Sequence, residues 1–255
     1  MIQENNRSGF SLIEVAIALT IIGIMVGYAV PTFMKYRQHK QFQVTRNHQE
    51  VILYSLASYL LSAKQIPCPA DPAAPAKTFG SARLMCTVPA NKLIGIVPFR
   101  TLGLPESIVK DGFGRYFTYA IDKEVRNEDF GFDDQEDYYC SRKGGVGSNR
   151  LLVKNELGES IFSQGTGDNK EREDDFVVAV LVSYGPTGNG AFLKGGSRIK
   201  GDKLSLDEQL NTNSTLTFVD RPYSIVTDHP FRQIVKWVSH KNLAGVYARN
   251  ACRVE

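Results

Sequence analysis

A single carboxylate lies inside the longest apolar run of this sequence. Between Phe10 and Met34, the only formally charged side chain is that of Glu14. An ionised carboxylate costs about 3 kcal/mol at the centre of a bilayer, and this cost falls toward the headgroups. Glu14 lies near one end of the run, but it still needs a positively charged partner once the surrounding surface is buried.

The four cysteines indicate disulfide bonds rather than a metal or redox motif. No two of them form a C-x-x-C pair, which argues against a zinc ribbon or a thioredoxin-type site. An even count is typical of an oxidising compartment, and buried free thiols in a cytosolic protein are the alternative. Of three possible connectivities, we expect Cys68 with Cys86, which would close a loop of about 18 residues, and Cys140 with Cys252.

Two acidic clusters offer the oxygen ligands that calcium prefers. One contains Asp133 and Asp134, and the other contains Asp174 and Asp175. Neither cluster follows the D-x-[DN]-x-[DN]-G spacing of an EF-hand, and charged runs are commonly solvated loops. We therefore interpret both clusters as solvated loops and expect no cofactor, with a calcium site as the alternative.

The sequence contains no recognisable catalytic constellation. The glycine-rich stretches 144–147 and 185–190 lack the Lys-Ser or Lys-Thr of a phosphate-binding loop, so we interpret them as turns. No serine has the G-x-S-x-G context of a nucleophile elbow, and no histidine pair has the H-E-x-x-H spacing of a zinc peptidase. We therefore expect no catalytic residues and no enzyme activity. A membrane-anchored enzyme would need a clustered polar site.

The element that positions Glu14 is predicted to be one long helix. At about 1.5 Å per residue, a helix over Phe10–Met34 is long enough to cross a hydrocarbon layer of about 30 Å. Helical periodicity then continues, with apolar residues near one face: Val44, Ile52, Leu56, Tyr59, Leu60 and Ala63. We predict a continuous helix over residues 10–64, transmembrane over 10–34, which Pro67-Cys68-Pro69 ends.

The flank before the apolar run is unlike an ordinary secretory signal, because no small-residue cleavage site follows the run. A short polar leader ends at Gly9, and Phe10-Ser11-Leu12-Ile13-Glu14 follows. This order resembles the type IV prepilin family. The resemblance implies that residues 1–9 are a leader, that a prepilin peptidase cuts between Gly9 and Phe10, and that the new amine of Phe10 is methylated.

Gly23 and Pro31 stand where many members of that family carry helix-weakening residues. Glycine raises the entropy cost of a helix and proline removes a backbone donor, so the segment between them can loosen during assembly. A single-pass anchor with an incidental kink is the alternative. The resemblance also gives Glu14 a partner, because its carboxylate could pair with the N-terminal amine of a neighbouring subunit and so select the filament register.

The remaining residues, 65–255, are predicted to form a β-rich globular domain. Turn residues separate segments rich in β-branched and aromatic side chains: Ile94–Pro98, Tyr116–Ile121, Leu151–Val153, Phe176–Val182, Thr215–Val219 and Ile234–Val238. We expect an α+β fold in which the long N-terminal helix packs on a C-terminal antiparallel β-sheet. The stretch Asp111-Gly112-Phe113-Gly114 resembles a turn of the type II secretion pseudopilins, with Gly and Phe replacing Pro and Trp.

Charge alone leaves the membrane orientation open. The leader contains Arg7 and Glu4, and the cations that follow the apolar run are Lys35, Arg37, Lys40 and Arg46. Taken alone, this bias favours the opposite orientation under the positive-inside rule. The Gly-Phe-Glu arrangement and the cysteines instead favour an inner-membrane protein whose C-terminal domain lies in the periplasm.

These features predict a pilin-like filament subunit without catalysis of its own. The expected partners are the prepilin peptidase, other pilin or pseudopilin subunits, an inner-membrane assembly platform and membrane lipid; with a net charge of +3, no nucleic acid is expected. A globular domain of about 190 residues is large for a major subunit, which favours a minor pseudopilin of a type II secretion or type IV pilus-like machine. A pilus subunit for adhesion, motility or DNA uptake is the alternative.

Overall fold

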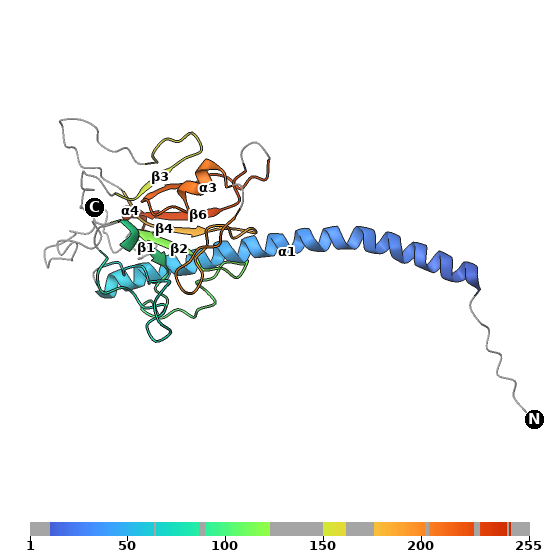
Figure 1. The fold of residues 1–255 in the computed structure, drawn as a ribbon, viewed down its shortest axis with the longest axis horizontal. Helices are drawn as coiled ribbons and strands as arrows, with labels where there is room; N and C mark the ends of the chain where they lie inside the picture. The colour runs from blue at the N-terminus through green and yellow to red at the C-terminus, as the bar shows by residue number, and fades with distance from the viewer. Residues whose placement is uncertain are drawn as a thin grey trace, which may run out of the picture. The chain divides into compact units, whose positions relative to one another are not determined.

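The computed structural model describes residues 11–63, 65–86, 90–122, 150–161, 176–201, 204–226, 230–243 and 245. Within these residues the fold is α+β, with a long N-terminal helix followed by a four-stranded antiparallel sheet (Figure 1). The chain divides into two compact units, residues 1–42 and 43–255. The boundary between them lies inside the long helix α1, which runs from Leu12 to Ala63.

Helix α1 confirms the long helix predicted from periodicity. In the first unit its described residues are exposed up to Lys40. In the second unit, buried residues recur every three or four positions: Thr45, Gln49, Ile52, Leu53, Leu56, Ala57 and Leu60. This spacing places them on one face of the helix, which packs into the core of the globular unit.

The four-stranded sheet has the order β1 (Ile94–Ile96), β2 (Thr118–Ile121), β4 (Val177–Ser183) and β6 (Ile234–Ser239), and each neighbouring pair is antiparallel. Every residue of β4 is buried, so both faces of this central strand are covered. The sequence predicted all of these strands to within a few residues. The part of α1 in the second unit runs beside this sheet (Figure 1).

Two further strands form a separate ladder, in addition to the predicted antiparallel sheet. Strand β3 (Leu152–Lys154) pairs in parallel with β5 (Thr217–Val219). The chain between them passes through β4 and helix α3 (Leu206–Leu210), and parallel pairing needs such a long crossover. On β5, the Asn211 side chain acts as a further pairing partner: its Nδ2 donates to the Val219 carbonyl at 2.9 Å, and its Oδ1 accepts from the Val219 N–H at 2.7 Å.

Polar contacts fasten the first buried turn of α1 to the rest of the globular unit. The Gly112 N–H donates to Thr45 Oγ1 at 2.9 Å. The Gln49 amide Nε2 donates to the Ile234 carbonyl at 3.2 Å and lies 3.5 Å from the Leu181 carbonyl. Because a buried amide without partners would cost about 1–3 kcal/mol, these bonds explain how Gln49 is tolerated in the core.

Short helices complete the described part of the globular unit. The 3-10 helix η1 spans Ala90–Lys92, and helix α4 spans His240–Asn242 directly after β6. Helix α3 begins with a capping box, in which the Ser205 side chain accepts from the Glu208 N–H and the Glu208 side chain accepts from the Ser205 N–H. This pair satisfies two backbone donors at the start of the helix.

Candidate processing and assembly site

Helix α1 begins with a reciprocal pair of hydrogen bonds between Ser11 and Glu14. The Ser11 N–H donates to Glu14 Oε2 at 3.1 Å, and the Glu14 N–H donates to Ser11 Oγ at 3.3 Å. This arrangement is a capping box, which satisfies backbone N–H groups that have no partner within the helix. The carboxylate also lies at the positive end of the helix dipole. Glu14 is therefore held locally, although its side chain is exposed.

The role of Ser11 was missed in the sequence, although its signal is present. The spacing S-x-x-E before an apolar run is typical of a capping box. Ser11 lies three residues before Glu14, which is the spacing that this motif requires. The structure thus adds one residue to the predicted site.

The other predicted residues of this site differ in what the structure describes. Gly9 and Phe10 lie outside the described residues. Gly23 lies within α1, and a Cβ added there would meet no atom within 4 Å. Pro31 also lies inside the helix, where it has no N–H to donate to the Gly27 carbonyl. The proposed assembly roles of Glu14, Gly23 and Pro31 remain predictions.

The helix surface around Glu14 is apolar and exposed. Between Leu12 and Met34 every described side chain is exposed, and within the described part of the chain α1 is the helix that is long and apolar enough to cross a membrane. Two hydroxyls in this run are satisfied by the helix itself. Thr20 Oγ1 donates to the Ala16 carbonyl at 2.8 Å, and Thr32 Oγ1 donates to the Tyr28 carbonyl at 3.0 Å. Such bonds suit a segment surrounded by hydrocarbon, where water offers no alternative partner.

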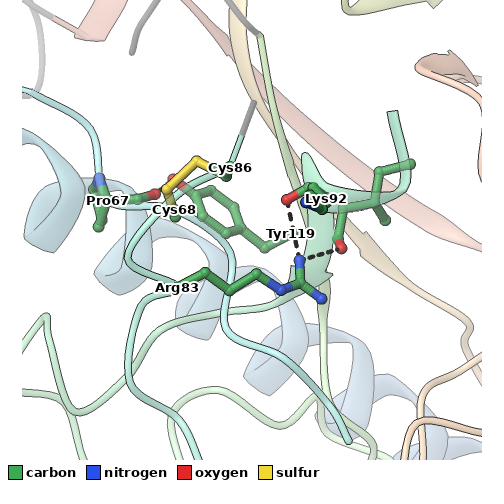
Figure 2. Close-up of a disulfide and its surroundings, with 7 residues drawn as sticks. Pro67, Cys68, Arg83, Cys86, Lys92 and Tyr119 are labelled. Atoms are coloured by element: carbon green, nitrogen blue, oxygen red, sulfur yellow. Dashed lines mark hydrogen bonds between the residues drawn. A yellow bond between two sulfur atoms is a disulfide. The ribbon is translucent and has the colours of Figure 1, made fainter. Parts of the chain in front are cut away.

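A disulfide joins Cys68 to Cys86, which is one of the two expected pairings (Figure 2). The Cα atoms are 5.7 Å apart, and both cysteines are buried. Nearby, Tyr119 Oη donates to the Pro67 carbonyl at 3.2 Å, so the first residues of this loop are also tied to β2. Cys140 and Cys252 lie outside the described residues.

Arg83 holds the second half of the disulfide loop against the edge strand. One of its guanidinium nitrogens donates to the carbonyls of Lys92 and Ile94, each at 3.0 Å (Figure 2). Burial lowers the pKa of Arg83, and the carboxylate of Asp71, 3.6 Å away, opposes that shift. The loop is therefore fixed by a covalent bond and by these hydrogen bonds.

The turn at Asp111 is built around a buried carboxylate. Oδ1 of Asp111 accepts from the N–H groups of Phe113 at 3.0 Å and Arg115 at 2.9 Å, and Oδ2 accepts from Ser183 Oγ at 2.6 Å. Burial raises the pKa of Asp111, although these hydrogen bonds oppose the shift. Gly114 adopts a φ of 83° here, a conformation that favours glycine. Asp111 thereby fastens the turn to β4.

Two further predictions concern calcium binding and a glycine-rich stretch. The calcium candidates Asp133, Asp134, Asp174 and Asp175 lie outside the described residues, and among the described residues no three His, Cys, Asp or Glu side chains are grouped to hold a metal. The stretch 185–190 is a turn, as predicted: Gly185 has a φ of 56°, and a Cβ there would lie 2.0 Å from the Arg232 carbonyl oxygen.

Comparison with known families supports the interpretation of the N-terminus. Residues 5–30 match the family model of the prokaryotic N-terminal methylation motif. This motif is the hallmark of the prepilin-type signal found in type IV pilins and pseudopilins. Comparison with curated proteins and with solved structures gave no match. The matched segment covers the Ser11–Glu14 capping box and most of the exposed apolar run.

Proposed function

We propose that this chain is a pilin-like filament subunit that is trimmed by a prepilin peptidase before assembly. The observation that carries this proposal is the combination of the methylation motif over residues 5–30 with an exposed apolar helix that begins at Leu12. An exposed apolar surface of this size calls for burial, first in lipid and then against other helices. The N-terminal part of the chain is thus the anchor and the assembly surface.

Glu14 is the residue that we assign to subunit register. In the isolated chain its carboxylate is held by the capping box with Ser11. Next to a neighbouring subunit, the same carboxylate can pair with the amine of Phe10 after cleavage. In the low-dielectric interior of a helix bundle, breaking such a pair costs about 3–5 kcal/mol, enough to disfavour other registers.

The C-terminal globular unit is proposed to lie in the periplasm. The Cys68–Cys86 disulfide supports this compartment, because disulfides persist in oxidising environments. The expected partners of the globular unit are related subunits and an inner-membrane assembly platform.

We favour a minor subunit of a type II secretion or type IV pilus-like machine because of the size of the globular unit. A pilus subunit for adhesion, motility or DNA uptake is the alternative. Deletion of the gene, with assays of secretion and of surface piliation, separates the two.

The direct test is N-terminal mass spectrometry of the chain produced with and without a prepilin peptidase. With the enzyme present, we expect the mature chain to begin with N-methylated Phe10. Gly9→Val serves as the control, because a bulky side chain at the cleavage site should leave the leader attached. A mature chain that begins at Met1, or after residue 30, in the presence of the enzyme contradicts the proposal.

A further inference from the structure

A group of cations follows the apolar run of α1, and aromatic side chains lie near the end of that run and among the cations. The cations Lys35, Arg37 and Lys40 are all exposed. Within the described part of the chain, none of these three forms an ion pair. The sequence contains no acidic residue between Glu14 and Glu50, so the helix offers these cations no carboxylate of its own.

Aromatic residues accompany the cations. Tyr28, Phe33 and Tyr36 are 78%, 61% and 62% exposed, respectively. Aromatic rings are enriched at both faces of a membrane, where an apolar ring and a polar group or edge can be accommodated together. The combination of rings and cations in one stretch is therefore typical of the headgroup layer rather than of open solvent.

The length of the apolar run places the cations at that depth. From Leu12 to Met34 the helix rises about 33 Å, which is close to the 30 Å hydrocarbon layer of a bilayer. Lys35, Arg37 and Lys40 then fall within about 9 Å of the end of the run, and the headgroup layer is about 5–8 Å thick. Their long side chains can reach phosphate oxygens at this level. Arg46 lies about 9 Å further along the same helix, beyond the headgroups.

The three cations surround the helix axis instead of forming a stripe. At about 100° per residue, the directions of Lys35, Lys40 and Arg37 follow one another at intervals of about 140°, 60° and 160°. A helix that lies flat on a membrane carries its cations on one face. A ring of cations instead suits a helix that crosses the headgroup layer and contacts lipids on all sides.

We propose that Lys35, Arg37 and Lys40 form a collar that binds anionic phospholipid headgroups where the apolar run ends. This inference rests on the proposed membrane crossing of α1. The collar supplies an energetic reason for cations on the side of the membrane that the positive-inside rule disfavours. Each cation near an anionic surface favours binding by about fivefold, so the collar should enrich anionic lipid around the unassembled subunit.

The test reconstitutes the full chain in an equimolar mixture of phosphatidylglycerol and phosphatidylcholine. After mild detergent extraction, native mass spectrometry measures which lipids stay bound. For the wild-type chain, we expect phosphatidylglycerol to exceed its share of the mixture by about fivefold, and to decline in high salt. The variant with Lys35→Gln, Arg37→Gln and Lys40→Gln should retain the two lipids in their bulk proportion.

Two controls make the outcome decisive. Arg46→Gln removes an exposed cation outside the collar and should leave the enrichment unchanged, so an equal loss in Arg46→Gln overturns the assigned location. Equal enrichment in the triple variant and the wild type, or none in the wild type, overturns the collar. Carbonate extraction of membranes is measured first: release of the wild-type chain contradicts the membrane crossing itself, whereas retention without enrichment contradicts the collar alone.

Discussion

Asp111 shows how a single buried carboxylate organises a turn. It accepts hydrogen bonds from two backbone N–H groups of its own turn and from Ser183 on β4. The sequence singled out the stretch Asp111–Gly114 by its resemblance to a pseudopilin turn, but it gave no indication of the partner. Ser183 lies 72 residues further along the chain, and such a contact depends on tertiary structure that no local pattern encodes.

The raised pKa of Asp111 makes its contribution to stability depend on pH. The folded state keeps the proton over a range in which the unfolded chain, with a pKa of about 3.9, has lost it. Linkage then requires that the contribution of this group falls as the pH rises from about 4 through the folded-state pKa. Asp111→Asn keeps an acceptor for the Phe113 and Arg115 N–H groups but cannot ionise.

We therefore predict that the free energy of unfolding of Asp111→Asn increases relative to that of the wild type as the pH rises over this range. Thermal unfolding of the full chain in detergent, followed by near-ultraviolet circular dichroism at a series of pH values, measures this difference. Leu61→Ala, at a half-exposed position, changes no ionisable group and is the control; it should differ from the wild type by an amount that does not vary with pH. If the variant Asp111→Asn instead loses stability relative to the wild type as the pH rises, the raised pKa assigned to Asp111 is wrong.

At the scale of elements, enrichment in β-branched and aromatic residues identified the strands of the sheet, and helical periodicity identified the length of α1. Periodicity did not identify the polar residues of the buried face of α1. Thr45 and Gln49 stand four residues apart, in step with Ile52, Leu53 and Leu56, and this register is the signal that would have found them. They were missed because polar residues are assigned to solvent by default, whereas here backbone atoms of the turn and the sheet satisfy them.

The pairing of β3 with β5 could not be predicted for a different reason. Strand propensity reports that a segment is extended, but not which segment lies beside it. The parallel ladder depends on a crossover through β4 and α3 and on the Asn211 side chain, which pairs with β5. The crossover joins segments far apart in the sequence, and a side chain that pairs with a strand leaves no mark in strand propensity.

We predict that the buried face of α1 carries much of the stability of the globular unit. Leu56 is fully buried, whereas Leu61 on the same helix is 41% exposed. Leu56→Ala should lower the free energy of unfolding by about 2–5 kcal/mol, because it removes apolar contacts and leaves a cavity. Leu61→Ala makes the same chemical change at a half-exposed position and should cost less than about 1.5 kcal/mol. Denaturant titration of both variants tests the ranking, and equal losses would argue against the packing described for α1.

At the scale of the whole molecule, the two compact units differ in whether their apolar side chains are exposed or buried. The described residues of the first unit expose their apolar side chains along α1 up to Met34, whereas the second unit has its own buried core and a disulfide. A change at Glu14, in the first unit, should therefore leave the folding of the second unit intact, because every core residue that the structure describes belongs to the second unit. Assembly and folding can thus be perturbed independently.

This independence allows the two roles of Glu14 to be separated by a pair of variants. Glu14→Gln keeps a side-chain acceptor for the Ser11 N–H, as glutamine serves in capping boxes, but it removes the charge. Glu14→Ala removes both. If the charge pair with a neighbouring amine sets the filament register, both variants should lose filament incorporation to a similar extent, since each removes about 3–5 kcal/mol of pairing per subunit.

Filaments sheared from cells and quantified by immunoblot measure incorporation. Resistance to carbonate extraction and an intact Cys68–Cys86 disulfide verify that the subunit is inserted and folded. Normal incorporation of Glu14→Gln together with failure of Glu14→Ala would assign Glu14 to helix capping instead, and normal incorporation of both would remove it from assembly.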